Sequence, residues 1–64
     1  MYALHVFFNG SDTPSHIEYP SNAGQALARI PALLAEHHGC EKIIVYNSET
    51  RLFSVDCHGN TTPG

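Results

Sequence analysis

The sequence predicts an α+β fold, a two-layer sandwich in which one helix packs on one face of a four-stranded antiparallel sheet. Two alternating, β-rich runs surround a cluster of turn-forming residues, a stretch with apolar residues at helical spacing follows, and two more β-rich runs come last. The expected order is therefore ββαββ. We expect residues 1–57 to form a single domain and residues 58–64, which are small and polar, to form a flexible tail.

The first predicted hairpin joins residues 2–8 to residues 15–19. Both runs alternate in the manner of half-buried strands, and the intervening NGSDTP is rich in turn formers. In the first strand, His5 and Phe7 lie on the face opposite Leu4. The pattern predicts an antiparallel hairpin whose two faces differ in polarity.

A helix is predicted after Pro20. Asn22 followed three residues later by Gln25 has the form of a capping box, and Gly39 is the expected left-handed stop after the last turn. Apolar residues, with one histidine, recur at three- and four-residue spacing: Ala23, Ala26, Leu27, Ile30, Leu33, Leu34 and His37. This stripe predicts one face packed on the sheet, with His37 as a packed imidazole.

Pro31 interrupts the predicted helix. Inside a helix, proline removes a backbone hydrogen bond and clashes with the carbonyl of Leu27, at a cost of about 3 kcal/mol. The apolar stripe keeps its phase across the proline, which favours a single kinked helix. The alternative is two short helices, with Pro31 as the first residue of the second.

Residues 41–47 and 51–57 are the clearest strands, and their register depends on the length of the loop between them. A three-residue loop gives a wholly apolar face of Ile43, Val45, Phe53 and Val55. A loop of even length instead mixes Lys42 and Arg51 with apolar side chains. We expect the odd loop because register follows the cleaner hydrophobic segregation.

One helix can cover only one face of the sheet, and the other face is predicted to carry an apolar patch. Its members are Phe7, Ile44, Tyr46 and Leu52, with His5, His16 and Ser54 among them. A patch of neighbouring apolar side chains marks interfaces, and Tyr and Phe are enriched at such sites. We therefore expect a protein interface here, for self-association or for a heterologous partner.

Length and charge limit the classes of function. The chain has 64 residues, so hydrophobic burial alone leaves little margin for folding, and we expect a homodimer or another partner chain to add stability. The net charge of −3, with only three basic residues, argues against direct binding of nucleic acid or of anionic membranes. No membrane-spanning run or secretion signal is recognised, which indicates a cytoplasmic protein.

Cysteine and histidine cluster at two places and suggest a metal site. The candidates are His38, Cys40, Cys57 and His58, whose soft ligands suit zinc. The second hairpin brings Cys40 and Cys57 to one end of the sheet, but the knuckle spacing of two cysteines separated by two residues is absent. We expect no resident metal or other cofactor.

Thiol catalysis is also disfavoured. Cys40 follows the end of the predicted helix, where the partial negative charge of the helix opposes a thiolate. Glu41 and Asp56 come close in either hairpin register, but two solvated carboxylates at the end of a sheet are common. We expect no enzymatic activity.

In size, acidity and ββαββ order the chain resembles small phage- or plasmid-encoded modulators, such as some anti-CRISPR and host-takeover proteins. This resemblance implies a small cytoplasmic protein that binds and modulates or inhibits a larger protein. The alternative function is zinc binding through Cys40, Cys57 and neighbouring histidines.

Overall fold

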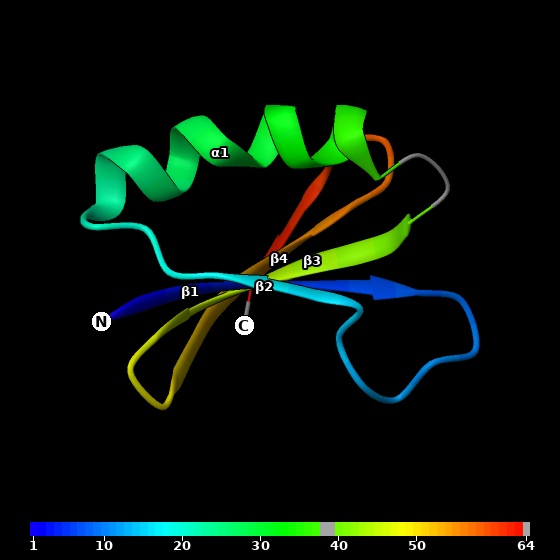
Figure 1. The fold of residues 1–64 in the computed structure, drawn as a ribbon, viewed down its shortest axis with the longest axis horizontal. Helices are drawn as coiled ribbons and strands as arrows, with labels where there is room; N and C mark the ends of the chain where they lie inside the picture. Colours follow the sequence, from blue (N-terminus) through cyan, green and yellow to red (C-terminus); the bar gives the residue numbers. More distant parts are fainter. Residues whose placement is uncertain (38–39, 64) are drawn as a thin grey trace.

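The protein is a five-stranded antiparallel sheet with one helix across one face (Figure 1). The computed structural model describes residues 1–37 and 40–63, apart from the side chains of Cys40 and Glu41. Its elements are β1 (Tyr2–Phe8), β2 (His16–Glu18), α1 (Ala23–Glu36), β3 (Cys40–Asn47), β4 (Thr50–Asp56) and β5 (Thr61–Pro63). The predicted α+β class with a single helix is confirmed.

The sheet has five strands where the sequence predicts four. Thr61–Pro63, within the segment expected to be a tail, pair with β4 as the edge strand β5. The turn before β5 is a three-residue hairpin loop: the N–H of Gly59 donates to the Asp56 carbonyl, and Gly59 has a φ of 87°. Pro63 is compatible with this position because an edge strand needs fewer backbone donors.

The strand order is β2-β1-β3-β4-β5, so pairing of β1 with β3 joins the two predicted hairpins through the middle of the sheet. The core lies between this sheet and α1. Its buried members are Leu4, Val6, Ala26, Ile30, Leu33, Ile43, Val45 and Val55, with Phe8, Leu34 and Phe53 packed against them. Alternation along the strands places these side chains on the face that the helix covers.

Helix α1 begins at the predicted cap. The Asn22 side chain accepts a hydrogen bond from the N–H of Gln25 at 2.9 Å, and Gln25 reaches back to the N–H of Ser21 at 3.3 Å. The helix runs without a break through Pro31, so the alternative of two short helices is wrong. The predicted stop at Gly39 lies outside the described residues.

The helix buries a narrower stripe than the sequence predicts. Ala26, Ile30 and Leu33 are buried, whereas the side chain of Leu27 is 58% exposed.

Within the part of the chain that the structure describes, no helix is long and apolar enough to cross a membrane.

The predicted apolar face of the second hairpin is confirmed, although its turn differs. Ile43 pairs with Val55 and Val45 pairs with Phe53, which is the register of a three-residue loop. Nearer the turn, Tyr46 pairs with Arg51, and the register shift leaves Leu52 as an extra residue in β4. A tight turn with Ser48 at a φ of 57° and a bulge therefore replace the longer loop.

Candidate functional site

The side of the sheet that faces away from α1 is the surface predicted to bind a partner, and we call it the open face. In Figure 1 the helix lies on one side of the sheet, and no second helix covers the other side within the described residues. The cross-strand register assigns these residues to it: Ala3, His5, Phe7, Ile17, Lys42, Ile44, Tyr46, Arg51, Ser54, Asp56 and Thr62.

A cluster of rings occupies the middle of the open face. The His5 ring centroid lies 4.7 Å from that of Tyr46 and 6.4 Å from that of Phe7. The ammonium of Lys42 lies 5.6 Å from the centroid of the Phe7 ring, within the range of a cation–π contact. These side chains come from β1 and β3, the two strands that pair through the middle of the sheet.

The four residues predicted to form the interface differ in accessibility. Phe7 and Tyr46 are half-buried, and Leu52 in the bulge of β4 is 38% exposed. Ile44 is only 4% exposed, because its cross-strand neighbours His5 and Ser54 flank it on the same face. Ile44 therefore forms the floor of the ring cluster, and the rings above it are what a partner can reach.

His16 does not lie on the open face, contrary to the sequence-based expectation. It pairs with Val6, and Glu18 pairs with Leu4, so both side chains lie on the face that carries the helix. The expectation was wrong because the alternation of β2 fixes which residues share a face, but not which of its faces meets the core. Ile17, which pairs with His5, is the β2 residue on the open face.

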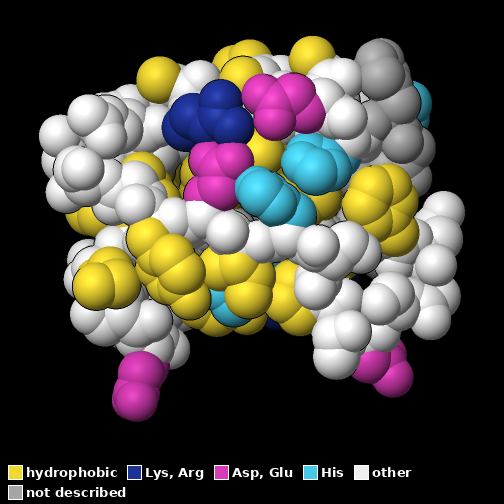
Figure 2. All heavy atoms as spheres, in the orientation of Figure 1, with side chains coloured by type: hydrophobic (Ala, Val, Ile, Leu, Met, Phe, Trp, Pro, Cys, Tyr) yellow, Lys and Arg dark blue, Asp and Glu magenta, His cyan; other side chains and the backbone are white. Residues whose placement is uncertain are grey.

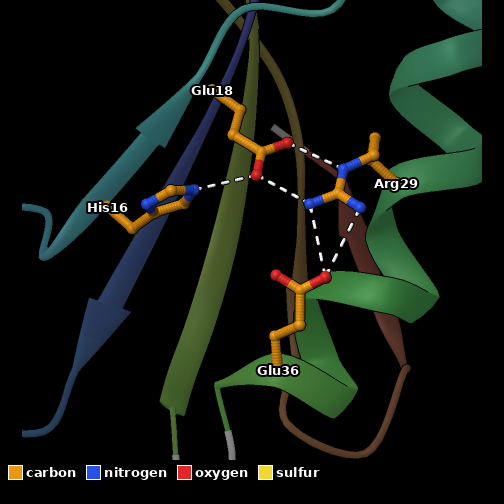
Figure 3. A network of polar contacts seen from close by, with 4 residues as sticks. All are labelled: His16, Glu18, Arg29 and Glu36. Carbon is orange, nitrogen blue, oxygen red and sulfur yellow. Dashed lines mark hydrogen bonds and ion pairs between the residues drawn. The ribbon is translucent and has the colours of Figure 1, made fainter.

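His16 and Glu18 belong to a polar network that ties the edge strand β2 to α1 (Figure 3). Both nitrogens Nε and Nη2 of Arg29 donate to the Glu18 carboxylate, at 2.8 and 2.7 Å. His16 Nε2 lies 2.8 Å from Oε2 of this carboxylate, the same oxygen that accepts from Nη2 of Arg29. Glu36, two turns further along the same face of α1, lies 3.5 Å from the Arg29 guanidinium.

The network strongly favours the ionised form of Glu18. Hydrogen bonds from the Arg29 guanidinium, followed by the bond with His16, lower the pKa of the Glu18 carboxyl from 4.5 to about 2. Donation to the Glu18 carboxylate in turn raises the pKa of the Arg29 guanidinium. Two hydrogen bonds between guanidinium and carboxylate also fix the orientation of both groups, so this pair links β2 to α1.

His37, the residue that caps α1, stands beside this network. Its ring centroid lies 4.9 Å from that of His16 and 6.3 Å from that of Phe8. Its backbone N–H donates to the Leu33 carbonyl, and its side chain is half-buried. In Figure 2, histidine, acidic and basic side chains gather between the helix layer and the sheet edge.

The predicted metal ligands are only partly described. His38 and the side chain of Cys40 lie outside the described residues. Cys57 and His58 are exposed in the β4–β5 turn, and Cys57 is a free cysteine. Among the described residues, no three His, Cys, Asp or Glu side chains are grouped so that they could hold a metal ion.

The turn that carries Cys57 is organised by Asp56. Its Oδ1 accepts hydrogen bonds from the backbone N–H groups of His58 at 2.8 Å and Asn60 at 2.9 Å. These backbone donors, Asn60 foremost, lower the pKa of the Asp56 carboxyl. The carboxylate thus faces its own turn, which gives Asp56 a structural role in the approach to β5.

Sequence reasoning missed the network of His16, Glu18 and Arg29. The residues are brought together by the docking of α1 on β2, which no local spacing encodes. The one available signal is that Arg29 lies beside the apolar stripe of the helix rather than opposite it, where an isolated cation needs a partner. The described part of the chain encloses no pocket.

Comparison with known proteins adds no relative. The chain matches no family model, no curated protein and no solved structure at a significant level.

Proposed function

We propose that the protein is a non-enzymatic interaction module that binds a larger protein through the open face and so modulates or inhibits it. The observation that supports this most is the ring cluster of His5, Phe7 and Tyr46 on a sheet face that no described element covers. Half-buried rings held in place by a sheet offer a large contact area at little entropic cost.

The exposed apolar side chains around the cluster support the same surface. Leu52 is 38% exposed and Ile17 is 40% exposed, and they lie on strands to either side of the central pair β1 and β3. Burying such side chains against a partner contributes roughly 25 cal/mol per Å² of apolar area. The resemblance of the chain to small phage- and plasmid-encoded modulators agrees with a binding function of this kind.

The test compares capture of partners by the protein and by two variants, Tyr46→Ala on the open face and Leu27→Ala on the outer side of α1. Each variant removes one large apolar side chain that reaches the surface, so they form a matched pair. We expect proteins captured from the source cell by the unmodified chain and by Leu27→Ala to be lost with Tyr46→Ala. Each such protein is then tested again in purified form.

Folding of the variants is checked by circular dichroism, because Tyr46 is half-buried. If Tyr46→Ala unfolds, Ile17→Gln replaces it, since Ile17 is 40% exposed on the open face and is not part of the core. The proposal is wrong if both open-face variants fold and retain every captured partner. It is also wrong if Leu27→Ala alone loses them, which would move the binding surface to the helix.

A further inference from the structure

The open face carries a charge pattern that goes beyond an apolar patch. Lys42 of β3 pairs with Phe7 of β1, and Arg51 of β4 pairs with Tyr46 of β3, so each cation is the cross-strand neighbour of an aromatic residue. Tyr46 is four positions further along β3 than Lys42, about 13 Å at the rise of an extended strand. Two cations thus bracket the ring cluster at its two ends.

The third basic residue is engaged elsewhere. Arg29 lies on the helix side, bonded to Glu18 and close to Glu36. Asp56 pairs with Lys42 across the two strands, but its carboxylate accepts from the backbone of its own turn. Among the described residues, neither Lys42 nor Arg51 takes part in an ion pair, and both lie on the open face.

We propose that the partner of the open face is a protein segment that presents carboxylates to Lys42 and Arg51 around an apolar centre. This inference rests on the proposed function. Exposed ion pairs contribute little each, so contact with the rings supplies most of the affinity. The charges select the partner, because like charges placed opposite each other are strongly disfavoured at an interface.

A second copy of the chain fits this surface poorly. A copy presents the same two cations, and the one carboxylate that the register places on the open face, Asp56, accepts hydrogen bonds from its own turn. A partner segment with free carboxylates instead opposes cation to carboxylate.

Single-stranded nucleic acid also fits less well. Bases bind such sheets by stacking on free ring faces, but the ammonium of Lys42 already lies over the Phe7 ring. Phosphate backbones need clustered cations, and the open face has two, with the acidic residue Asp56 directly across from Lys42.

The experiment uses a phage-displayed library of random twelve-residue peptides, selected on the intact protein. We expect the selected peptides to be enriched in Asp and Glu over the starting library, and their binding to weaken as salt is raised. The double variant Lys42→Gln/Arg51→Gln should weaken the strongest peptides by about tenfold.

The matched control is Ala28→Glu/Ala35→Glu, at two exposed positions of α1. Both double variants lower the net charge by two units, from −3 to −5, the first by removing two cations and the control by adding two carboxylates, and only the first changes the open face. We expect the control to bind the peptides within about twofold of the unmodified protein, because screened charges on the far side contribute little. An equal loss in the control overturns the inference.

Four further outcomes are decisive. Peptides that depend on Tyr46 but show no acidic enrichment overturn the inference and leave the proposed function standing. Peptides unaffected by Tyr46→Ala, with the fold intact, overturn both. A twelve-nucleotide oligodeoxythymidylate that binds more tightly than the peptides and is released by Lys42→Gln/Arg51→Gln identifies a nucleic acid partner instead. A dimer in sedimentation that Tyr46→Ala dissociates identifies a second copy, and either of these last two results overturns the inference.

Discussion

At the scale of single residues, the charged groups on the two faces of the sheet have different roles. On the helix side, Glu18 and Arg29 satisfy each other at 2.7 and 2.8 Å and hold β2 against α1. On the open face, Lys42 lies 5.6 Å from the Phe7 ring and Arg51 pairs with Tyr46, and neither takes part in an ion pair among the described residues. The first arrangement stabilises the fold, and the second leaves charge available for recognition.

The first prediction concerns Glu18→Gln, which removes the negative charge that Arg29 and His16 contact. We expect a loss of about 1 kcal/mol at pH 7, the size of a partly exposed, hydrogen-bonded ion pair. Urea unfolding of the two proteins, followed by circular dichroism, measures the difference. An effect below the error of the fit would show that the network does not stabilise the native state.

The pH dependence of this difference follows from the lowered pKa of Glu18. The unfolded chain, with a carboxyl pKa near 4.5, binds a proton more readily than the native state, with a pKa of about 2. The stabilisation is therefore complete above pH 4.5 and is lost as the pH falls toward 2. The difference between the protein and Glu18→Gln should shrink across this range, and a constant difference contradicts the assignment.

These residues also show why the polar network could not be predicted from the sequence. Glu18 and Arg29 are eleven positions apart, and their contact depends on which edge of the sheet the helix crosses. His16 was placed on the wrong face because strand alternation does not tell which face of β2 meets the core. By contrast, the contact between Phe7 and Lys42 follows from strand alternation once β1 is known to pair with β3.

At the scale of elements, the features set by helix capping and by apolar alternation were predicted, and the polar edge strand β5 was not. The Asn22–Gln25 cap, the single helix through Pro31 and the apolar register of β3 with β4 each depend on residues close in sequence. The strand β5 was missed because its residues are polar and exposed. The signal for it was the turn, with Asp56 followed three residues later by Gly59.

The second prediction tests this turn through Asp56. Asp56→Ala removes the oxygen that accepts from the backbone of His58 and Asn60, whereas Asp56→Asn can keep an acceptor in the same place. We expect hydrogen exchange at the β4–β5 pair, including the Asp56 N–H bonded to the Asn60 carbonyl, to speed up several-fold in the alanine variant only. Equal exchange in the two variants would show that Gly59 and the backbone alone hold the turn.

At the scale of the whole molecule, a single helix must secure one face of the sheet with very few side chains. Three helix residues are buried against it, Ala26, Ile30 and Leu33. A chain of 64 residues has a free energy of unfolding of about 3–10 kcal/mol. Each of the larger core contacts is therefore a sizeable share of the total, and the outer side of the helix should matter little unless another chain covers it.

The last prediction compares two leucines of α1 that differ in burial. Leu33 is 0% exposed, so Leu33→Ala leaves a cavity between helix and sheet and should cost about 3 kcal/mol. Leu27 is 58% exposed, so Leu27→Ala should change the free energy of unfolding by less than about 0.5 kcal/mol. Thermal unfolding measured at two protein concentrations checks both values. A large, concentration-dependent loss with Leu27→Ala would mean that the outer side of α1 is buried against a second copy, because only an intermolecular contact makes the melting temperature depend on concentration.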